Sequence, residues 1–290
     1  MINKELELIL IDLDGTLLNS DLIISEQTKQ VIHDLLEQQY KIAIATGRHY
    51  KEAKKLTKEF SGLAYITTNG SYVEKQTGDM IFSQPLAKQS INLLLDILNK
   101  YNNVITTLFT INNVLVEDET KFLQRLFHDL RASSANFKSK TKAEIIQSDK
   151  WVMPLKEVAD LKEFTNENEI DGHKCFVIGE EKEIVASYQE IRKKLKSDVE
   201  ISNSGANNLE INAANISKGK ALKELAKELG ISLDKTIAFG DSGNDLEMLK
   251  VANIAVAMGN SKSEKIREEA DFITESNDNQ GVAKVLSDLL

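Results

Sequence analysis

Short apolar runs alternate with amphipathic segments in the first third of the chain. Residues 6–11 (LELILI) are almost wholly apolar, and two further runs lie in KIAIATGR and LAYITTNG. After the first run, Ser25–Gln39 carries apolar residues at helical spacing, and the Ser25 hydroxyl is suited to cap its first turn. Short apolar strands separated by helices are typical of a parallel sheet covered on both faces. We therefore predict such a sheet.

The same rhythm returns in the last quarter. The pattern predicts a helix over Lys218–Leu229 with Gly230 ending it, and then a strand in TIAFGDSGND. Two strand-and-loop units (NIAVAMGNS and DFIT) and a closing helix (QGVAKVLSDLL) follow. The two ends of the chain are therefore expected to form one doubly wound, Rossmann-like α/β domain.

Between them, from about Leu86 to Ile211, hairpins mix with helices. Asn112-Asn113 suits a tight hairpin turn, since Asn tolerates positive φ. A strand and a helix are expected between the second and third helices of this block. The other predicted elements are helices at Ala87–Tyr101, Glu119–Arg131 and Glu181–Leu195, a hairpin at Val104–Asp118, a strand in HKCFVIGE, and a strand pair at 199–204 and 208–211. We predict a core domain of residues 1–84 and 212–290, with an α+β domain of residues 85–211 inserted into it.

Composition narrows the classes of function. The chain has 290 residues, of which 41% are hydrophobic and 28% charged, as in ordinary soluble proteins. A net charge of −9 argues against nucleic acid or an anionic membrane as the main partner. One cysteine, Cys175, fits a reducing compartment. No apolar run reaches about 18 residues and the N-terminus lacks signal-peptide features, so a cytoplasmic protein is expected. With one cysteine and four scattered histidines, a metal would be held by oxygen.

Acidic residues follow two of the predicted strands. Asp12 and Asp14 end the first strand, where Gly15 permits a sharp exit, and Asp241 and Asp245 lie in GDSGND. Ligands bind at the carboxyl ends of strands in open parallel sheets, so these acids are expected to converge. Clustered carboxylates repel one another unless a cation lies among them, and Mg²⁺ suits oxygen ligands. The simpler interpretations are a turn-capping pair and a turn-rich loop.

Two further polar residues fall at the same edge. Thr46, in ATGR, offers a hydroxyl beside backbone N–H groups that can seat phosphate oxygens. Lys218, in NISKGKAL, can neutralise a phosphate or the carboxylate that attacks it. A helix cap and a solvated surface lysine are the simpler alternatives.

Taken together, these segments resemble the four-motif order of the haloacid dehalogenase superfamily of phosphohydrolases. The segments IDLDGTLL, IATGR, ITTNG, LEINAANISKGKAL, FGDSGNDLEML, AVAMGNS and DNQGVAKVL are similar to the Cof-type subfamily, which carries a type IIB cap. The resemblance covers essentially the whole chain. It implies that the inserted α+β block is the cap.

The resemblance also implies roles. Asp12 would be the nucleophile that becomes an aspartyl-phosphate, and Asp14 would protonate the leaving alcohol and then activate water. The residues implied around Mg²⁺ are Asp12, Asp14 through its backbone carbonyl, Asp241, and Asp245 at greater distance or through Lys218. The residues expected to contact the phosphate or substrate are Thr46, Gly47, Arg48, Asn69, Lys218 and Asn244. One departure is Asn215, where relatives usually have Gly; because Asn also adopts positive φ, we expect the turn to be preserved.

The leading hypothesis is a Mg²⁺-dependent phosphatase of small phosphorylated metabolites such as sugar phosphates, nucleotides or cofactor phosphates. A phosphotransferase or mutase shares the nucleophile, and a non-catalytic phospholigand-binding regulatory module shares the fold. A receiver-type signalling domain would not use the first strand's acid as acceptor. We expect a monomer or weak homodimer, a solvated loop at Lys138–Lys142, and a packing role for Trp151.

Overall fold

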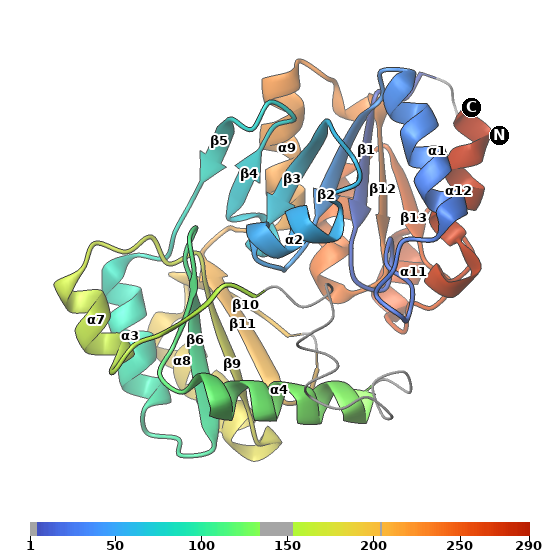
Figure 1. Cartoon of the computed structure of the whole chain (residues 1–290). Helices are drawn as coiled ribbons and strands as arrows, with labels where there is room; N and C mark the ends of the chain where they lie inside the picture. The colour runs from blue at the N-terminus through green and yellow to red at the C-terminus, as the bar shows by residue number, and fades with distance from the viewer. Residues whose placement is uncertain (1–4, 134–152, 204) are drawn as a thin grey trace. The chain divides into compact units, whose positions relative to one another are not determined.

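Two compact units make up the described part of the chain, which covers residues 5–133, 153–203 and 205–290 of a computed structural model (Figure 1). The first unit holds residues up to Arg48, Leu56–Ser83 and Ser217–Leu290, and the second holds His49–Lys55 and Gln84–Ile216. The expected loop at 138–142 and Trp151 lie outside the described residues. No described helix is long and apolar enough to cross a membrane.

The first unit is built on an eight-stranded sheet, counted over the described residues. Strands β14 to β3 run parallel, which confirms the predicted α/β class, and β4 and β5 add an antiparallel edge that the sequence pattern did not indicate. The order is β14 (Phe272–Ile273), β13 (Ile254–Ala257), β12 (Thr236–Gly240), β1 (Leu8–Asp12), β2 (Lys41–Ala45), β3 (Leu63–Thr67), β4 (Tyr72–Glu74) and β5 (Met80–Ser83).

The register of the central strands brings their carboxyl ends together. Asp12 pairs with Ala45, so Thr46 follows directly at the end of the next strand. Ile11 pairs with Phe239, which places the end of β12 beside Asp12. The residues that leave β1, β2 and β12 therefore share one edge of the sheet, as the sequence analysis expected.

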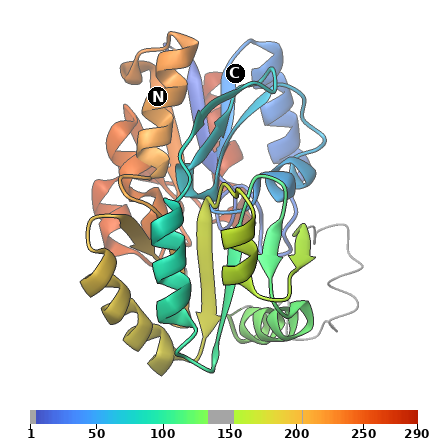
Figure 2. The same cartoon turned by 90° about the vertical axis from the view of Figure 1, so that its left-hand side faces the viewer.

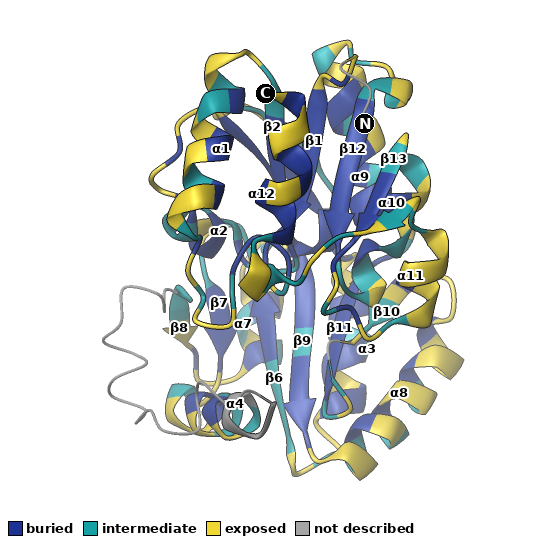
Figure 3. Cartoon of the chain, turned by 90° about the vertical axis from the view of Figure 1, so that its right-hand side faces the viewer, coloured by how far each residue is buried: buried dark blue, intermediate teal, exposed yellow. Residues whose placement is uncertain are grey.

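Helices cover both faces of this sheet. Leu8 and Leu10 pack with α9 (Lys218–Leu229), α10 (Leu246–Val251) and α11 (Glu264–Glu269). On the opposite face, α1 (Glu26–Glu37) packs against α12 (Gly281–Leu286). Figure 2 shows the sheet between α9, in orange, and α1, in blue, and Figure 3 shows its central strands buried. Because apolar side chains on both faces are removed from water, these strands read as continuous apolar runs.

Two helix ends follow the sequence closely. Ser25 caps α1, accepting a hydrogen bond from the Thr28 N–H, and Gly230 ends α9 in the left-handed region. The described 3₁₀ turns of the unit are Thr68–Gly70, Leu233–Lys235, Gly243–Asp245, Asn277–Asn279 and Ser287–Leu289; α2 (Tyr50–Leu56) belongs to the second unit except for its last residue.

The second unit has a six-stranded sheet, again over the described residues. Its pairs are antiparallel except for β7 with β8. The order is β10 (Val199–Ser202), β11 (Asn208–Ala213), β9 (Lys174–Gly179), β6 (Val104–Phe109), β7 (Val114–Val116) and β8 (Leu155–Glu157). Its helices are α3 (Lys88–Leu98), α4 (Glu119–Ser133), α7 (Leu161–Glu167) and α8 (Glu181–Leu195).

The predicted hairpin exists, but the reason given for its turn was wrong. Among the described residues, positive φ is found at neither Asn112 nor Asn113. The turn is held by Thr110 instead, whose hydroxyl accepts from the N–H of Asn112 and of Asn113 and donates to the Asn113 carbonyl. A hydroxyl that bonds backbone groups two and three residues ahead stabilises the turn without left-handed backbone.

Candidate active site

Three carboxylates converge at the carboxyl edge of the first unit's sheet. Asp12 ends β1, Asp241 follows β12, and Asp245 closes the next 3₁₀ turn. One carboxylate oxygen of each lies within 4.8 Å of the others. Asp12 and Asp245 are buried, and Asp241 is partly buried. The structure thus brings together acids that lie more than two hundred residues apart in the sequence.

Lys218 lies among these acids. Its Nζ donates to Asp12 Oδ1 and to Asp245 Oδ1, each at 2.6 Å, and its side chain is fully buried. The simpler interpretation of a solvated surface lysine was therefore wrong. Lys218 is the first residue of α9, after Ser217, whose hydroxyl caps the helix. Asn215 has φ 61°, so the left-handed turn that we expected there is confirmed.

Close packing fixes the first turn of α9. A Cβ at Gly219 would lie 2.1 Å from the Glu247 carbonyl oxygen, so only glycine lets the helix approach α10 this closely. A second close approach involves the residue before Lys218: a Cβ at Gly70 would lie 2.4 Å from the Ser217 carbonyl oxygen. The backbone that carries Lys218 is thereby held from two sides.

The charges of this cluster are strongly coupled. Burial, and then the neighbouring Asp245, raise the pKa of Asp12 well above its ordinary value, although the Lys218 charge opposes them. Burial lowers the pKa of Lys218, but the charges of Asp12 and Asp245 outweigh it, so the net shift is upward and the ammonium stays charged. One lysine does not neutralise three acids, so the site favours a further positive charge.

Asp241 is the best evidence that a cation fits. Its Oδ1 is buried and has no hydrogen-bond partner among the described residues. Burial, and then the Asp245 charge, raise the pKa of Asp241 to about 7. An oxygen that is desolvated, unpartnered and beside two other carboxylates is a natural ligand for a hard divalent ion such as Mg²⁺. The residues present therefore fit the group that the motifs imply.

Asp245 mainly supports the others. Its Oδ2 accepts from the backbone N–H groups of Asp241 and Ser242, both at 3.0 Å, while its Oδ1 accepts from Lys218. With both oxygens engaged, Asp245 fixes the loop that carries Asp241 and the lysine that contacts Asp12. The role expected of Asp245 near a metal, at greater distance or through Lys218, stays a prediction.

Asp14 lies in a different environment from Asp12. Arg48 grips both of its carboxylate oxygens, with Nε donating to Oδ2 and Nη2 to Oδ1, each at 2.7 Å. The Asp14 side chain is 47% exposed, and that of Arg48 is 20% exposed. The carboxylate of Asp14 does not belong to the converging cluster found among the described residues. The two acids of the first motif thus differ in environment: Asp12 is buried against Lys218, whereas Asp14 is half-exposed and paired with Arg48.

The remaining predicted residues are linked to one another by hydrogen bonds. Thr46 is buried; its hydroxyl accepts from the Arg48 N–H, and its carbonyl accepts from the Asn69 N–H. Gly47 lies between Thr46 and Arg48 in the same turn. Asn69 has φ 62°, and its Oδ1 accepts from Asn244 Nδ2 at 3.2 Å. The structure therefore gathers all of these residues at the same edge, within the first unit.

Two supporting residues were not singled out in the sequence. Asn260 Nδ2 donates to the Gly15 carbonyl at 2.8 Å, and the Ser261 hydroxyl donates to the Asp241 carbonyl at 2.6 Å. Both residues belong to the AVAMGNS segment, so the motif itself was the available signal. They hold the two acidic loops against each other.

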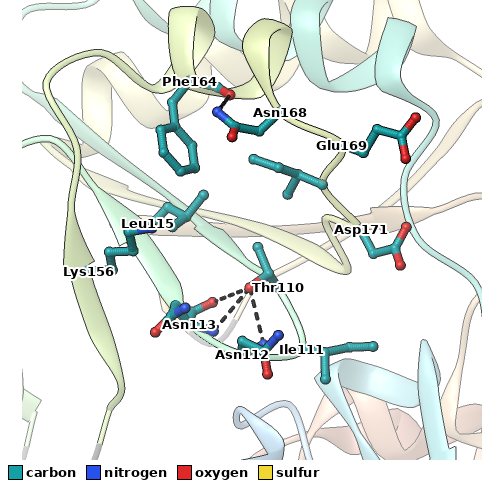
Figure 4. A pocket seen from close by; sticks show the side chains of 11 residues that line it. Thr110, Ile111, Asn112, Asn113, Leu115, Lys156, Phe164, Asn168, Glu169 and Asp171 are labelled. Carbon is teal, nitrogen blue, oxygen red and sulfur yellow. Dashed lines mark hydrogen bonds between the residues drawn. The ribbon is translucent and has the colours of Figure 1, made fainter.

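A separate pocket of about 330 Å³ lies in the second unit (Figure 4). Thr110, Asn112 and Asn113 of the β6–β7 turn line one side, and Phe164 and Asn168 line another. Its charged residues, Lys156, Glu169 and Asp171, are exposed, and it contains none of the predicted site residues. The charged residues that line this pocket are exposed, whereas Asp12, Asp245 and Lys218 are buried and paired, so the carboxylate cluster is the better candidate active site.

Comparison with known proteins identifies the family. Residues 9–286 match the family model of haloacid dehalogenase-like hydrolases. A 5-amino-6-(5-phospho-D-ribitylamino)uracil phosphatase of Bacillus subtilis is 29% identical over 97% of this chain and 95% of its own length. The solved structure of a haloacid dehalogenase-like hydrolase from B. subtilis is 26% identical with a TM-score of 0.84, covering 98% of this chain and all of that one.

The likeness to a second solved structure is evidence for the fold only, because the sequence identity is low. It is described as a subclass IIB sugar phosphatase of the haloacid dehalogenase superfamily, and it is 23% identical with a TM-score of 0.75, covering 97% of this chain and 98% of that one. The resemblance found in the motifs is thus confirmed across nearly the whole sequence. The chain belongs to the haloacid dehalogenase-like hydrolases.

Proposed function

We propose that this hydrolase is a Mg²⁺-dependent phosphatase of small phosphate esters that works through an aspartyl-phosphate on Asp12. The observation that carries the proposal is the arrangement around Lys218: one buried lysine holds Asp12, and the unpartnered oxygen of Asp241 lies in the same cluster. This places an oriented carboxylate beside positive charge, as attack on a phosphoryl group requires.

In the first step, a carboxylate oxygen of Asp12 attacks phosphorus and the bond to the ester oxygen breaks. Lys218 and the Thr46 turn hold the phosphoryl oxygens, and Asp14 gives a proton to the departing alcohol. In the second step, water gives a proton to Asp14 and attacks phosphorus, which releases phosphate and restores the Asp12 carboxylate. Bound Mg²⁺, held by Asp12, Asp241 and the Asp14 backbone carbonyl, would supply positive charge that reduces repulsion between the acids and the phosphate.

Several features support a small ester as the substrate. The B. subtilis relative is named for a phosphorylated ribityl-uracil compound, and the net charge of −9 disfavours polyanionic partners. We include sugar phosphates, nucleotides and cofactor phosphates in the proposed class. The inserted domain, residues 85–211, would act as the cap that excludes bulky substrates, in a cytoplasmic monomer or weak homodimer.

A panel of phosphate esters tests the proposal directly. Purified protein would be assayed for release of inorganic phosphate with Mg²⁺ and with EDTA. Release from at least one small ester, dependent on Mg²⁺, is expected. Transfer of the phosphoryl group to added alcohols, without release, would instead identify a phosphotransferase. Binding of esters with neither outcome would favour a regulatory module.

A further inference from the structure

We propose that Arg48 is a positioning residue that orients Asp14 as the proton donor and acceptor of the reaction. This inference rests on the proposed function. It goes beyond the substrate contact that the sequence suggested for Arg48, because the structure directs the guanidinium at an acid of the site. Both Nε and Nη2 donate to Asp14, one to each carboxylate oxygen, at 2.7 Å.

The paired geometry fixes more than distance. Two parallel N–H···O bonds hold the plane of a carboxylate, whereas the terminal torsion of an aspartate is otherwise broad. Asp14 needs such a constraint, because its side chain is 47% exposed. It precedes Gly15, whose φ is 78° and whose carbonyl is held by Asn260, so the backbone next to Asp14 is fixed and Arg48 acts on the carboxylate itself.

Arg48 is itself well anchored. Its N–H donates to the Thr46 hydroxyl at 3.1 Å, and its carbonyl accepts from the Thr68 N–H at 3.0 Å. The arginine backbone is thus tied to the same turn that is proposed to hold the phosphoryl group. The Arg48 side chain can therefore hold the Asp14 carboxylate in a fixed position relative to the phosphoryl group.

Stability gives a poor reason for the pair. Water screens ion pairs with this much exposure, and the two side chains lose freedom when they pair, which offsets part of the gain. Orientation of Asp14 is the property that the pair supplies better than solvent does. Arg48→Lys keeps the positive charge but removes the planar guanidinium that donates two parallel hydrogen bonds, so charge and geometry can be tested separately.

The test is the rate constant for phosphorylation of Asp12, measured by acid quench in single turnovers. An alkyl phosphate needs its leaving oxygen protonated, whereas an aryl phosphate such as p-nitrophenyl phosphate needs little help. In Arg48→Lys and Arg48→Gln, we expect a fall of about tenfold or more for the alkyl ester, with aryl phosphorylation within about threefold of the parent and KM nearly unchanged. Arg192→Gln, at an exposed arginine of α8, is the matched control and should match the parent.

A double-mutant cycle completes the test. If Arg48 acts through Asp14, then Arg48→Gln should cost almost nothing more in an Asp14→Asn background. Equal losses for both esters, a raised KM that Arg48→Lys restores, or full additivity would each overturn the inference and make Arg48 a phosphate ligand. Unchanged kinetics would reduce the pair to a surface contact. A parent enzyme that releases phosphate from no ester would be a failure of the proposed function instead.

Discussion

The side of Gly15 that would carry a side chain faces the carboxylate of Asp241. A Cβ built there would lie 2.5 Å from Asp241 Oδ2, and Gly15 has φ 78°. We predict that Gly15→Ala displaces Asp241, lowering kcat/KM by about tenfold or more, which is about 1.4 kcal/mol. Weaker Mg²⁺ binding, measured by calorimetry, should accompany the loss.

Gly62 provides the control for this substitution. Its φ is 86°, but no atom lies within 4 Å of a Cβ built there. Both alanine variants should lose about 1–2 kcal/mol of stability through left-handed strain, whereas only Gly15→Ala should lose activity. Equal activities in the two variants would show that the Gly15–Asp241 contact is unimportant for catalysis.

Metal dependence is the second prediction. Because Asp241 Oδ1 is buried without a partner and the pKa of Asp241 is raised to about 7, a cation should stabilise its charged form. Activity is expected to vanish with EDTA and return with Mg²⁺. Ca²⁺ should restore it poorly, since it takes more ligands in looser geometry and would misplace the attacking oxygen. Full turnover after chelation would contradict an oxygen-ligated metal.

The nucleophile gives the third prediction. Asp12→Asn should abolish turnover, because an amide cannot attack phosphorus, while circular dichroism should show an intact fold. The amide can still lie beside Lys218, which contacts Asp12 Oδ1 at 2.6 Å. Residual activity within about tenfold of the parent, roughly 1.4 kcal/mol in the barrier, would exclude Asp12 as the nucleophile.

Local patterns of the sequence predicted the fold well. The helix expected at Lys218–Leu229 has those bounds, because a capping serine, helical spacing of apolar residues and Gly230 all act over neighbouring residues. The short β4–β5 edge was missed, since strands of three and four residues carry too little periodicity. The antiparallel edge is therefore visible only once the sheet is assembled.

The site was predictable where family motifs carry it and less so elsewhere. Asp12 and Lys218 were expected to work on the same phosphoryl group, and the structure pairs them. The pairing of Arg48 with Asp14 was not foreseen, because it joins residues 34 positions apart through side chains that only the folded turn brings together. The Asn260 contact, spanning 245 positions, depends in the same way on tertiary structure.

A pH-dependent stability is expected from His49. Burial lowers the pKa of His49 from 6.5 to about 4; the Thr110 carbonyl opposes this shift, and charges on Lys51, Lys174 and His173 add to it. Between pH 6.5 and 4 the unfolded chain therefore binds a proton that the folded chain does not. The free energy of unfolding should fall as pH drops through this window, by about 3 kcal/mol at most. Above pH 6.5, titration of His49 should no longer change the free energy of unfolding.

Urea unfolding at pH 7.5 and pH 5 measures this effect. In His49→Gln, the loss of stability between the two values should be smaller than in the parent. His33→Gln, at an exposed histidine of α1, should retain the parent's dependence. The same dependence in all three proteins would mean that buried His49 does not set it.

The last prediction concerns Asp14, which separates a phosphatase from a protein that only accepts phosphate. In Asp14→Asn, the amide can neither protonate a leaving alkoxide nor take a proton from water. An aryl phosphate needs little acid assistance, so Asp12 should still be phosphorylated, whereas hydrolysis of the aspartyl-phosphate should be slow. Phosphoenzyme should therefore accumulate, in contrast to Asp12→Asn, where none can form.

Rapid-quench labelling with an aryl phosphate measures the trapped fraction. Asp14 is half-exposed, so the substitution should leave the fold intact; asparagine keeps one of the two oxygens that accept from Arg48, but its amide cannot exchange the proton. Turnover of alkyl phosphates near the parent's rate, without build-up of phosphoenzyme, would show that Asp14 only shapes the turn before Gly15. The opposite result, labelled protein with little released phosphate, would assign the proton transfer of the hydrolysis step to this carboxyl group, and slow phosphorylation by alkyl phosphates in the same variant would assign the first transfer to it as well.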